Sequence, residues 1–254
     1  YALASLQILP VTEVNDVIAM INALPATVTY ADKAAVEAAR AAVNALDATN
    51  QKRVTDSVGT RLTAAEEAIA ACKAKITDVE TKIDAIGDVT LDSAAAIEAP
   101  ETAYAALTDA EKADVSNAAK LTAARAAYDK LVADSATAGN VIAAIDEIGE
   151  VTLESESKIA AAEALYAALS DDQKALVTNY DKLTAARAKY DALKADKDAE
   201  DAFNAKVDAI GEVTLDSKAA IEDAEAAYAA LTDTQKAAVA DAKAKLDAAR
   251  AKYD

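Results

Sequence analysis

Hydrophobic residues recur along the chain at a fixed distance of 62 positions. The matching sets are Leu24, Ile86, Ile148 and Ile210; Leu107, Leu169 and Leu231; Tyr104, Tyr166 and Tyr228; and Val115, Val177 and Val239. A fixed period of this length is typical of repeat arrays, in which small units follow one another along the chain. The pattern therefore predicts one unit written four times within the 254 residues.

The third copy shows how the pattern within one unit predicts its first helix. Val141, Ile145 and Ile148 are spaced i, i+4 and i+7, which places them on one face of an amphipathic helix. Gly149 follows where a left-handed C-terminal cap is expected. Ser155, after a short connection, is a predicted N-cap of the second helix.

The second helix should end at a capping box, the S/T-x-x-E/Q spacing that starts a new helix. This spacing occurs as Thr108–Glu111, Ser170–Gln173 and Thr232–Gln235. In the third copy a short helix should begin at Ser170 and end near Asn179, and a third helix should carry Leu183. Each unit is therefore predicted to form a three-helix bundle.

The junctions between copies contain few helix breakers. Neither Leu62–Ile86 nor Leu183–Ile210 contains Gly or Pro, so the third helix of one copy should continue into the first helix of the next. A shared helix of about 28 residues would span roughly 42 Å. The second junction is weaker in helix formers, and we expect a bend near Gly139. The predicted fold is all-α: four tandem three-helix bundles, chained as in spectrin through shared long helices into an elongated rod.

The period also sets the expected boundaries. The segment 1–13 resembles the tail of a preceding repeat, closed by Pro10, and the four copies are 14–75 (copy 1, the most divergent), 76–138 (copy 2), 139–200 (copy 3) and 201–254 (copy 4). In copy 1, Pro25 replaces the loop glycine and one extra residue precedes Val28, so that loop should differ in shape. Pro100 lies inside the second helix of copy 2 and should kink it. Both ends of the chain look cut from a longer array.

The charge balance excludes two classes of partner. The chain has 44 acidic and 26 basic residues, a formal charge of −18 spread over all copies. Nucleic acids and anionic membrane surfaces attract clusters of Lys and Arg, so neither is an expected partner. No stretch approaches the roughly 20 apolar residues of a membrane span, and the first residues do not form a signal peptide.

The composition also argues against catalysis and metal binding. The chain contains no His and one Cys, which removes the commonest general base, the commonest metal ligand and any internal disulfide. The acidic run Asp196–Asp198 includes a lysine and lacks the EF-hand spacing. We predict no enzyme activity, no cofactor and no catalytic, cofactor-binding or metal-binding residues.

Three kinds of residue could still carry chemistry, and each has a structural reading. Cys72 aligns with Leu131 and Leu193, which predicts a buried small hydrophobe. The tyrosines could stack on sugars, but their helical spacing favours core packing. One position is Arg125, Arg187 and Arg250 in copies 2 to 4 and Glu66 in copy 1, and an ion pair with an acid on the first or second helix is expected there.

Two strings resemble known sequences: Ile-Gly-Glu-Val-Thr-Leu-Asp-Ser-Lys-Ala-Ala-Ile at 210–221, and Gln-Lys-Ala-Leu-Val-Thr-Asn-Tyr-Asp-Lys-Leu-Thr-Ala-Ala at 173–186. They resemble the tandem helical repeats of secreted and wall-attached proteins of Gram-positive bacteria, proteins that often also contain surface-layer, Ig-like or glycan-degrading modules. The resemblance covers copies 2 to 4 well and copy 1 loosely. It implies an extracellular, cell-wall or surface-layer setting and a spacer or adhesion role, and it brings no catalytic residues.

The leading functional hypothesis is a non-catalytic spacer or stalk that presents flanking domains of the same polypeptide away from the cell. One alternative is a multivalent binding module for a cell-wall or host glycan or a host protein. The other is a self-assembling surface-layer or filament segment, in which bundles pack laterally. The spacer would be monomeric, so concentration-dependent assembly separates it from the last reading.

Overall fold

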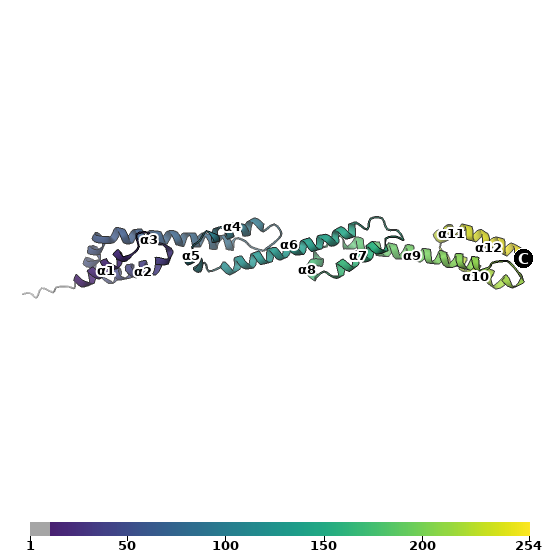
Figure 1. Cartoon of the computed structure of the whole chain (residues 1–254), viewed down its shortest axis with the longest axis horizontal. Coiled ribbons are helices and arrows are strands. Elements are labelled where there is room, and N and C mark those ends of the chain that lie inside the picture. Colours follow the sequence, from purple (N-terminus) through teal and green to yellow (C-terminus); the bar gives the residue numbers. More distant parts are fainter. Residues whose placement is uncertain (1–10) are drawn as a thin grey trace, which may run out of the picture. The chain divides into compact units, whose positions relative to one another are not determined.

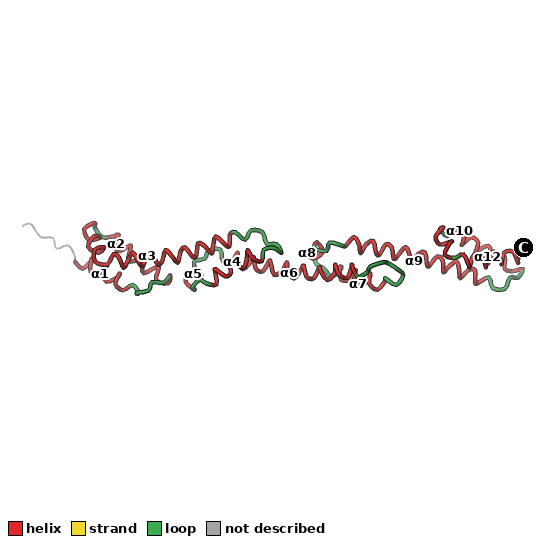
Figure 2. Tube along the Cα trace, turned by 90° about the horizontal axis from the view of Figure 1, so that it is seen from above, coloured by secondary structure: helices red, strands yellow, loops and turns green. Residues whose placement is uncertain are grey.

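The computed structural model describes residues 11–254, which form helices, turns and loops and no strand (Figure 2). The tail predicted to precede copy 1, including Tyr1–Leu3 and Pro10, lies almost entirely outside the described residues. The fold class is therefore all-α. The chain divides into two compact units, Tyr1–Val132 (unit 1) and Ala133–Asp254 (unit 2), which are described separately below.

Unit 1 is organised around one 37-residue helix, α3 (Ala48–Asp84). The other elements are α1 (Val11–Ala23), the 3-10 turn η1 (Tyr30–Asp32), α2 (Lys33–Ala45), α4 (Ala94–Ala105), α5 (Asp109–Ala113) and the first part of α6 (Ala118–Asp146). Helices α1 and α2 pack on the N-terminal part of α3, and α4 and α5 on its C-terminal part (Figure 1). The helix α3 therefore belongs to two successive groups of helices.

Unit 2 uses α9 (Tyr180–Ala209) in the same way. Its other elements are the rest of α6, α7 (Glu156–Ala167), α8 (Asp171–Ala175), the 3-10 turn η2 (Leu215–Ser217), α10 (Lys218–Ala230), α11 (Asp233–Ala238) and α12 (Ala240–Tyr253). Helix α7 packs on α9, and so do α10, α11 and α12 (Figure 1).

The stretches without breakers are continuous helices, as predicted. Helix α3 covers the first junction to Asp84, and α9 covers the third junction to Ala209. Helix α6 also runs unbroken from Ala118 to Asp146, so Gly139 does not end it. The bend expected near Gly139 stays a prediction.

Pro100 lies within α4 and is buried. Helices α4 and α7 have the same length of 12 residues and begin 62 positions apart, although α7 carries Ala162 where α4 carries Pro100. The proline therefore does not shorten its helix. The kink expected at Pro100 stays a prediction.

The loop after each first helix depends on a glycine in three copies. Gly87, Gly149 and Gly211 have φ of 65°, 62° and 58°, the left-handed conformation predicted for a C-terminal cap. Copy 1 has Pro25 instead, and proline cannot adopt a positive φ. There the Arg61 guanidinium donates to the carbonyls of Ile21, at 3.0 Å, and Leu24, so a side chain caps the end of α1.

The serine predicted to cap the second helix has a different role from the one expected. Ser155 occupies the N-cap position of α7, but its hydroxyl makes no capping bond to the helix. Instead the Thr152 amide donates to Ser155 Oγ at 3.0 Å. Thr90 with Ser93 and Thr214 with Ser217 repeat this contact at 2.9 Å. The serine therefore stabilises the loop before the helix.

The capping boxes form as predicted. Thr108, Ser170 and Thr232 each accept the amide of the residue three positions later, whose side chain accepts the amide of the cap in return. The short helix of copy 3 is shorter than expected, because α8 ends at Ala175 and not near Asn179. Asn179 is instead the N-cap of α9.

The buried cores differ between the two units. In unit 1 a single apolar cluster extends from Val14 to Ala124. In unit 2 there are two clusters, one from Ala138 to Tyr190 and one from Phe203 to Leu246. The same repeat thus gives one continuous core in unit 1 and two separate cores in unit 2.

Candidate functional site

Ion pairs between the second and third helices recur in copies 2 to 4. Each arginine makes two bonds to one glutamate, Arg125 to Glu101 at 2.8 and 2.6 Å. Arg187 with Glu163 and Arg250 with Glu225 repeat the geometry. The expected ion pair is confirmed, and its acid lies on the second helix.

Copy 1 contains the same pair with its charges exchanged. Glu66 stands on α3 and accepts from Arg40 on α2, with Nε–Oε1 and Nη2–Oε2 distances of 2.5 and 2.6 Å. The guanidinium lowers the pKa of the Glu66 carboxyl below its ordinary value, against the opposing effect of burial. The contact requires opposite charges and not a particular sign at either position, so its role is to hold two helices together.

In each of the first three copies, a separate shallow groove lies beside this ion pair. The three grooves have volumes of about 450 Å3 at Arg40, 380 Å3 at Arg125 and 430 Å3 at Arg187. The charged groups that line it are already bonded to each other. A ligand would have to displace these pairs before it could use them.

Most tyrosines pack against the cores. Tyr30 and Tyr190 are buried, while Tyr104, Tyr128, Tyr166, Tyr228 and Tyr253 are half-buried. Among the described tyrosines only Tyr180 is exposed, and its ring stacks on Tyr166 at a centroid distance of 4.0 Å. The described residues therefore carry no exposed tyrosine that recurs from copy to copy, which is the feature a repeated sugar platform would need.

Cys72 is only partly buried and packs against the edge of the unit 1 core. Burial raises the pKa of its thiol, and a hydrogen bond to the Glu111 carboxylate raises it further. A raised pKa favours the protonated, less nucleophilic thiol. The prediction of a fully buried residue was wrong in degree, because Cys72 faces the polar Glu111 as well as the core.

The contacts of Cys72 also correct its alignment within the repeat. Its partner Glu111 is the third residue of α5, and the corresponding residues Gln173 and Gln235 donate to Asp134 at 2.8 Å and Asp196 at 2.7 Å. Cys72, Asp134 and Asp196 are spaced by 62. Matching Cys72 to Leu131 and Leu193 relied on the local string Leu-Thr-Ala-Ala and misplaced it, because copy 1 is three residues shorter between that string and the junction.

Glu111 is almost fully buried, with 2 % of its surface exposed. Its carboxylate accepts the Thr108 amide at 2.8 Å and the Thr108 hydroxyl at 2.9 Å, and Lys75 lies 3.8 Å away. The bond from the Thr108 amide is the main cause of the lowered pKa of Glu111. A buried anion is thus held between α5 and α3.

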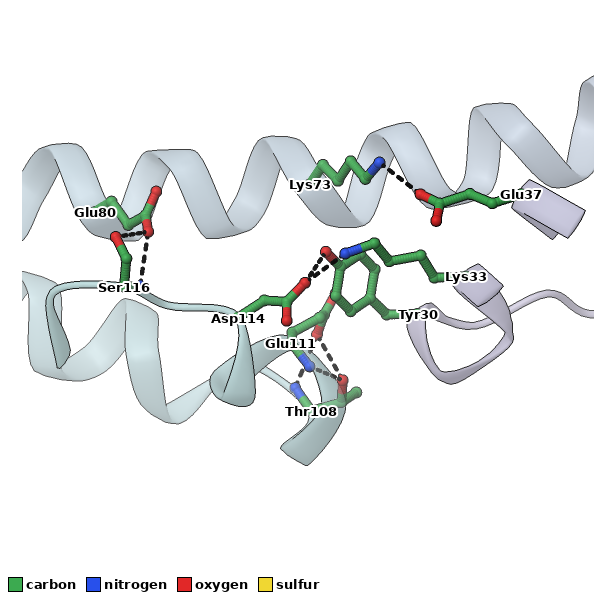
Figure 3. A network of polar contacts seen from close by, with 9 residues as sticks. All are labelled: Tyr30, Lys33, Glu37, Lys73, Glu80, Thr108, Glu111, Asp114 and Ser116. Carbon is green, nitrogen blue, oxygen red and sulfur yellow. Dashed lines mark hydrogen bonds and ion pairs between the residues drawn. The ribbon is translucent and has the colours of Figure 1, made fainter. Parts of the chain in front are cut away.

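The most elaborate polar contact of unit 1 lies beside Glu111 (Figure 3). We call Tyr30, Lys33 and Asp114 the Tyr30 clasp. The Tyr30 hydroxyl donates to Asp114 Oδ2 at 2.6 Å, and Lys33 Nζ lies 2.7 Å from the same oxygen. Tyr30 and Lys33 belong to copy 1 and Asp114 to copy 2, 84 and 81 residues later. The clasp therefore joins successive copies.

Sequence reasoning missed the clasp, although a signal was present. Tyr30 stands where the later copies carry Leu91, Leu153 and Leu215. Asp114 stands where they carry Leu176 and Ala238. Two coordinated departures from the repeat, in adjacent copies, are the signal that could have pointed to a contact.

The acidic residues of the run in α9 bond to lysines of the same helix and to Gln235 of α11. Lys194 binds Asp198 at 2.7 Å, Lys197 binds Asp201, and Asp196 accepts from Gln235. In the part of the chain that the structure describes, no group of three or more His, Cys, Asp or Glu could hold a metal ion. No described helix is long and apolar enough to cross a membrane.

Comparison with known proteins gave no match to any family model, to any curated protein or to any solved structure.

Proposed function

We propose that this chain is a non-catalytic spacer, built as four tandem three-helix bundles joined through shared helices. In this proposal the array is elongated and holds flanking domains of the same polypeptide away from a bacterial cell surface. The setting, secreted and associated with a cell wall or surface layer, rests on the resemblance of 173–186 and 210–221 to such repeats.

The observation that carries the proposal is the position of the long helices. Helices α3, α6 and α9 each pass through the boundary between two successive copies of the 62-residue pattern. A continuous helix resists bending more than a flexible linker, because every backbone hydrogen bond along it must be kept. Long helices at the copy boundaries favour a chain that keeps its ends apart.

The side-chain chemistry supports the same role. The arginine–glutamate pairs join the second and third helices within copies, and the capping boxes fix helix ends. Polar groups that bond each other in this way stabilise the helices. They do not form a group of free polar side chains that converge on a substrate. The net charge of −18 also favours solubility and disfavours close association of many copies.

Small-angle scattering of the whole chain tests the elongated form. A single compact domain of this length would have a radius of gyration near 18 Å by the size scaling of globular proteins. Four chained bundles, each advancing roughly 25–35 Å by helix-length arithmetic, should give about 30–40 Å. A value near 18 Å would overturn the proposal.

A concentration series in the same experiment separates the spacer from a self-assembling segment. The spacer predicts a molecular mass that stays at the monomer value of 26.1 kDa as concentration rises. Growth of the apparent mass with concentration would instead favour lateral assembly. Moderate salt should be present, because the acidic surface otherwise adds repulsion between molecules.

A further inference from the structure

We propose that the Tyr30 clasp locks copies 1 and 2 into one cooperative folding block, whereas copies 3 and 4 unfold independently. This inference uses the 62-residue division of the chain but does not depend on the spacer role. It concerns only contacts inside unit 1 and contacts inside unit 2.

The first observation is the direct contact between copies in unit 1. The turn η1 touches α5, so a loop of copy 1 packs on the short helix of copy 2. Tyr30 is only 6 % exposed, and its hydroxyl reaches Asp114, which also pairs with Lys33. A buried aromatic ring combined with a charge-assisted hydrogen bond makes a strong local interaction between the two copies.

The second observation is the continuous core beneath the clasp. Ile76 is buried, and Cys72 is partly buried, in one apolar cluster that includes residues of α1 and α2 as well as of α4 and α6. Helix α3 also packs directly on α5, so the two copies share this helix as well as the core. Removing apolar contacts from copy 2 should therefore weaken copy 1 as well.

In unit 2 the corresponding positions carry different chemistry. Leu153 stands in place of Tyr30 and is 43 % exposed, and Ala238 stands in place of Asp114 and has no carboxylate to accept a bond. Glu156 replaces Lys33 and binds Arg187 of its own copy at 3.1 Å. The residue that links two copies in unit 1 thus makes a link within one copy in unit 2.

The core of unit 2 is interrupted at the matching place. Asp196 stands where unit 1 has Cys72, and its carboxylate accepts from Gln235. The first apolar cluster of unit 2 ends with Leu193, and the second begins with Ala199. Helix α9 connects copies 3 and 4, as α3 connects copies 1 and 2. The two units therefore share a continuous helix and differ in the clasp and in the core.

Hydrogen exchange on the full chain tests the inference through two matched variants. Ile97 and Ile221 are fully buried, occupy corresponding positions and belong to the second copy of their units. In the Ile97→Ala protein, amides of α2, in copy 1, should exchange at least about tenfold faster, because local destabilisation spreads through a cooperative block. In the Ile221→Ala protein, amides of α7, in copy 3, should keep their wild-type rates.

Two further variants show whether the clasp is responsible. Tyr30→Phe removes only the hydroxyl and keeps the ring, and Asp114→Leu installs the residue of copy 3. In either background, Ile97→Ala should accelerate α2 much less than it does alone. The proposal is overturned if Ile97→Ala leaves α2 unchanged, if Ile221→Ala accelerates α7 equally, or if clasp variants preserve the full effect on α2. These results would leave the scattering test of the spacer unaffected.

Discussion

The junction at Cys72 in unit 1 and the junction at Asp196 in unit 2 occupy the same place in the repeat but are built from different side chains. At the first, Cys72 packs against a continuous apolar core, and Tyr30 and Lys33 bond to Asp114. At the second, Asp196 accepts from Gln235 and the apolar cores stop on either side.

The difference shows that a repeat can conserve its helices and vary the coupling between them. Both junctions have a continuous helix and a capping box, so the backbone design is shared. Only a few side chains decide whether neighbouring cores merge. In repeat proteins, stability is approximately a sum of terms for each unit and each interface, and here the interface term differs along one chain.

The largest predicted effect is a cavity in the last core. Phe203 is 1 % exposed and packs near Tyr228, with ring centroids 5.5 Å apart. Phe203→Ala should reduce the free energy of unfolding of copy 4 by about 3–5 kcal/mol. Because that core is separate, exchange of amides in α7 should stay at the wild-type rate.

Val79 is the matched position in unit 1, 124 residues earlier, and it is also buried. Val79→Ala removes less volume and should cost roughly 2 kcal/mol. Its effect should nevertheless appear in both α2 and α4. A response confined to α4 would show that unit 1 is divided in the same way as unit 2.

The next effect compares two glycines of unit 2 and should have opposite signs. Gly149 has φ of 62°, so Gly149→Ala should destabilise copy 3 by about 1–2 kcal/mol. Gly139 lies in α6 with no atom within 4 Å of an added Cβ, so Gly139→Ala should stabilise it by about 0.5–1 kcal/mol. Urea unfolding followed by circular dichroism measures both, and equal signs would contradict the assignment of the caps.

A smaller effect is expected from exchanging charges in copy 1. Arg40→Glu or Glu66→Arg alone places like charges together and should cost up to about 1 kcal/mol, since the pair is about one-third exposed. The double variant recreates the arrangement of copies 2 to 4 and should recover most of the loss. A double-variant cycle on unfolding free energies checks this, and additive losses would mean that the two side chains do not interact.

The smallest effect is a pH dependence of the unit 1 junction. Lys33 first, and then Tyr30, lowers the pKa of Asp114 by hydrogen bonding. The stabilisation should be complete above the ordinary aspartate value of about 3.9 and should be lost as pH falls through the lowered pKa. Exchange in α2 and α5 should therefore become faster only at strongly acid pH. The Asp114→Leu protein should show a smaller change, because Glu111, whose pKa is also lowered, still titrates in α5.

The sequence predicted much of the local structure because each signal involves neighbouring residues. Glycines such as Gly149 and capping boxes such as Ser170–Gln173 act over a few positions, and the absence of breakers in Leu183–Ile210 predicts helix directly. The ion pair at Arg187 was also predictable, because its position and the available acids repeat. The Ser155 hydroxyl was mispredicted, because the amides of the first turn of α7 and the Thr152 amide are alternative donors to the same oxygen, and the local spacing does not select between them.

The junction chemistry could not be predicted in the same way. Tyr30 and Asp114 are 84 residues apart, and nothing local distinguishes them from other substituted positions. Cys72 was compared with the wrong residues, because the repeat in copy 1 loses three positions inside a continuous helix. Departures from a repeat carry information about contacts between copies only when several are considered together.

Mechanical unfolding of single molecules, pulled from both ends of the chain, tests the difference between the units most directly. Fully extended chain spans at most about 3.6 Å per residue, so one cooperative step of about 120 residues lengthens the molecule by roughly 400 Å. We predict one step of this size for unit 1 and two steps of roughly 200 Å for unit 2. Four steps of equal size, or two long steps, would contradict the account.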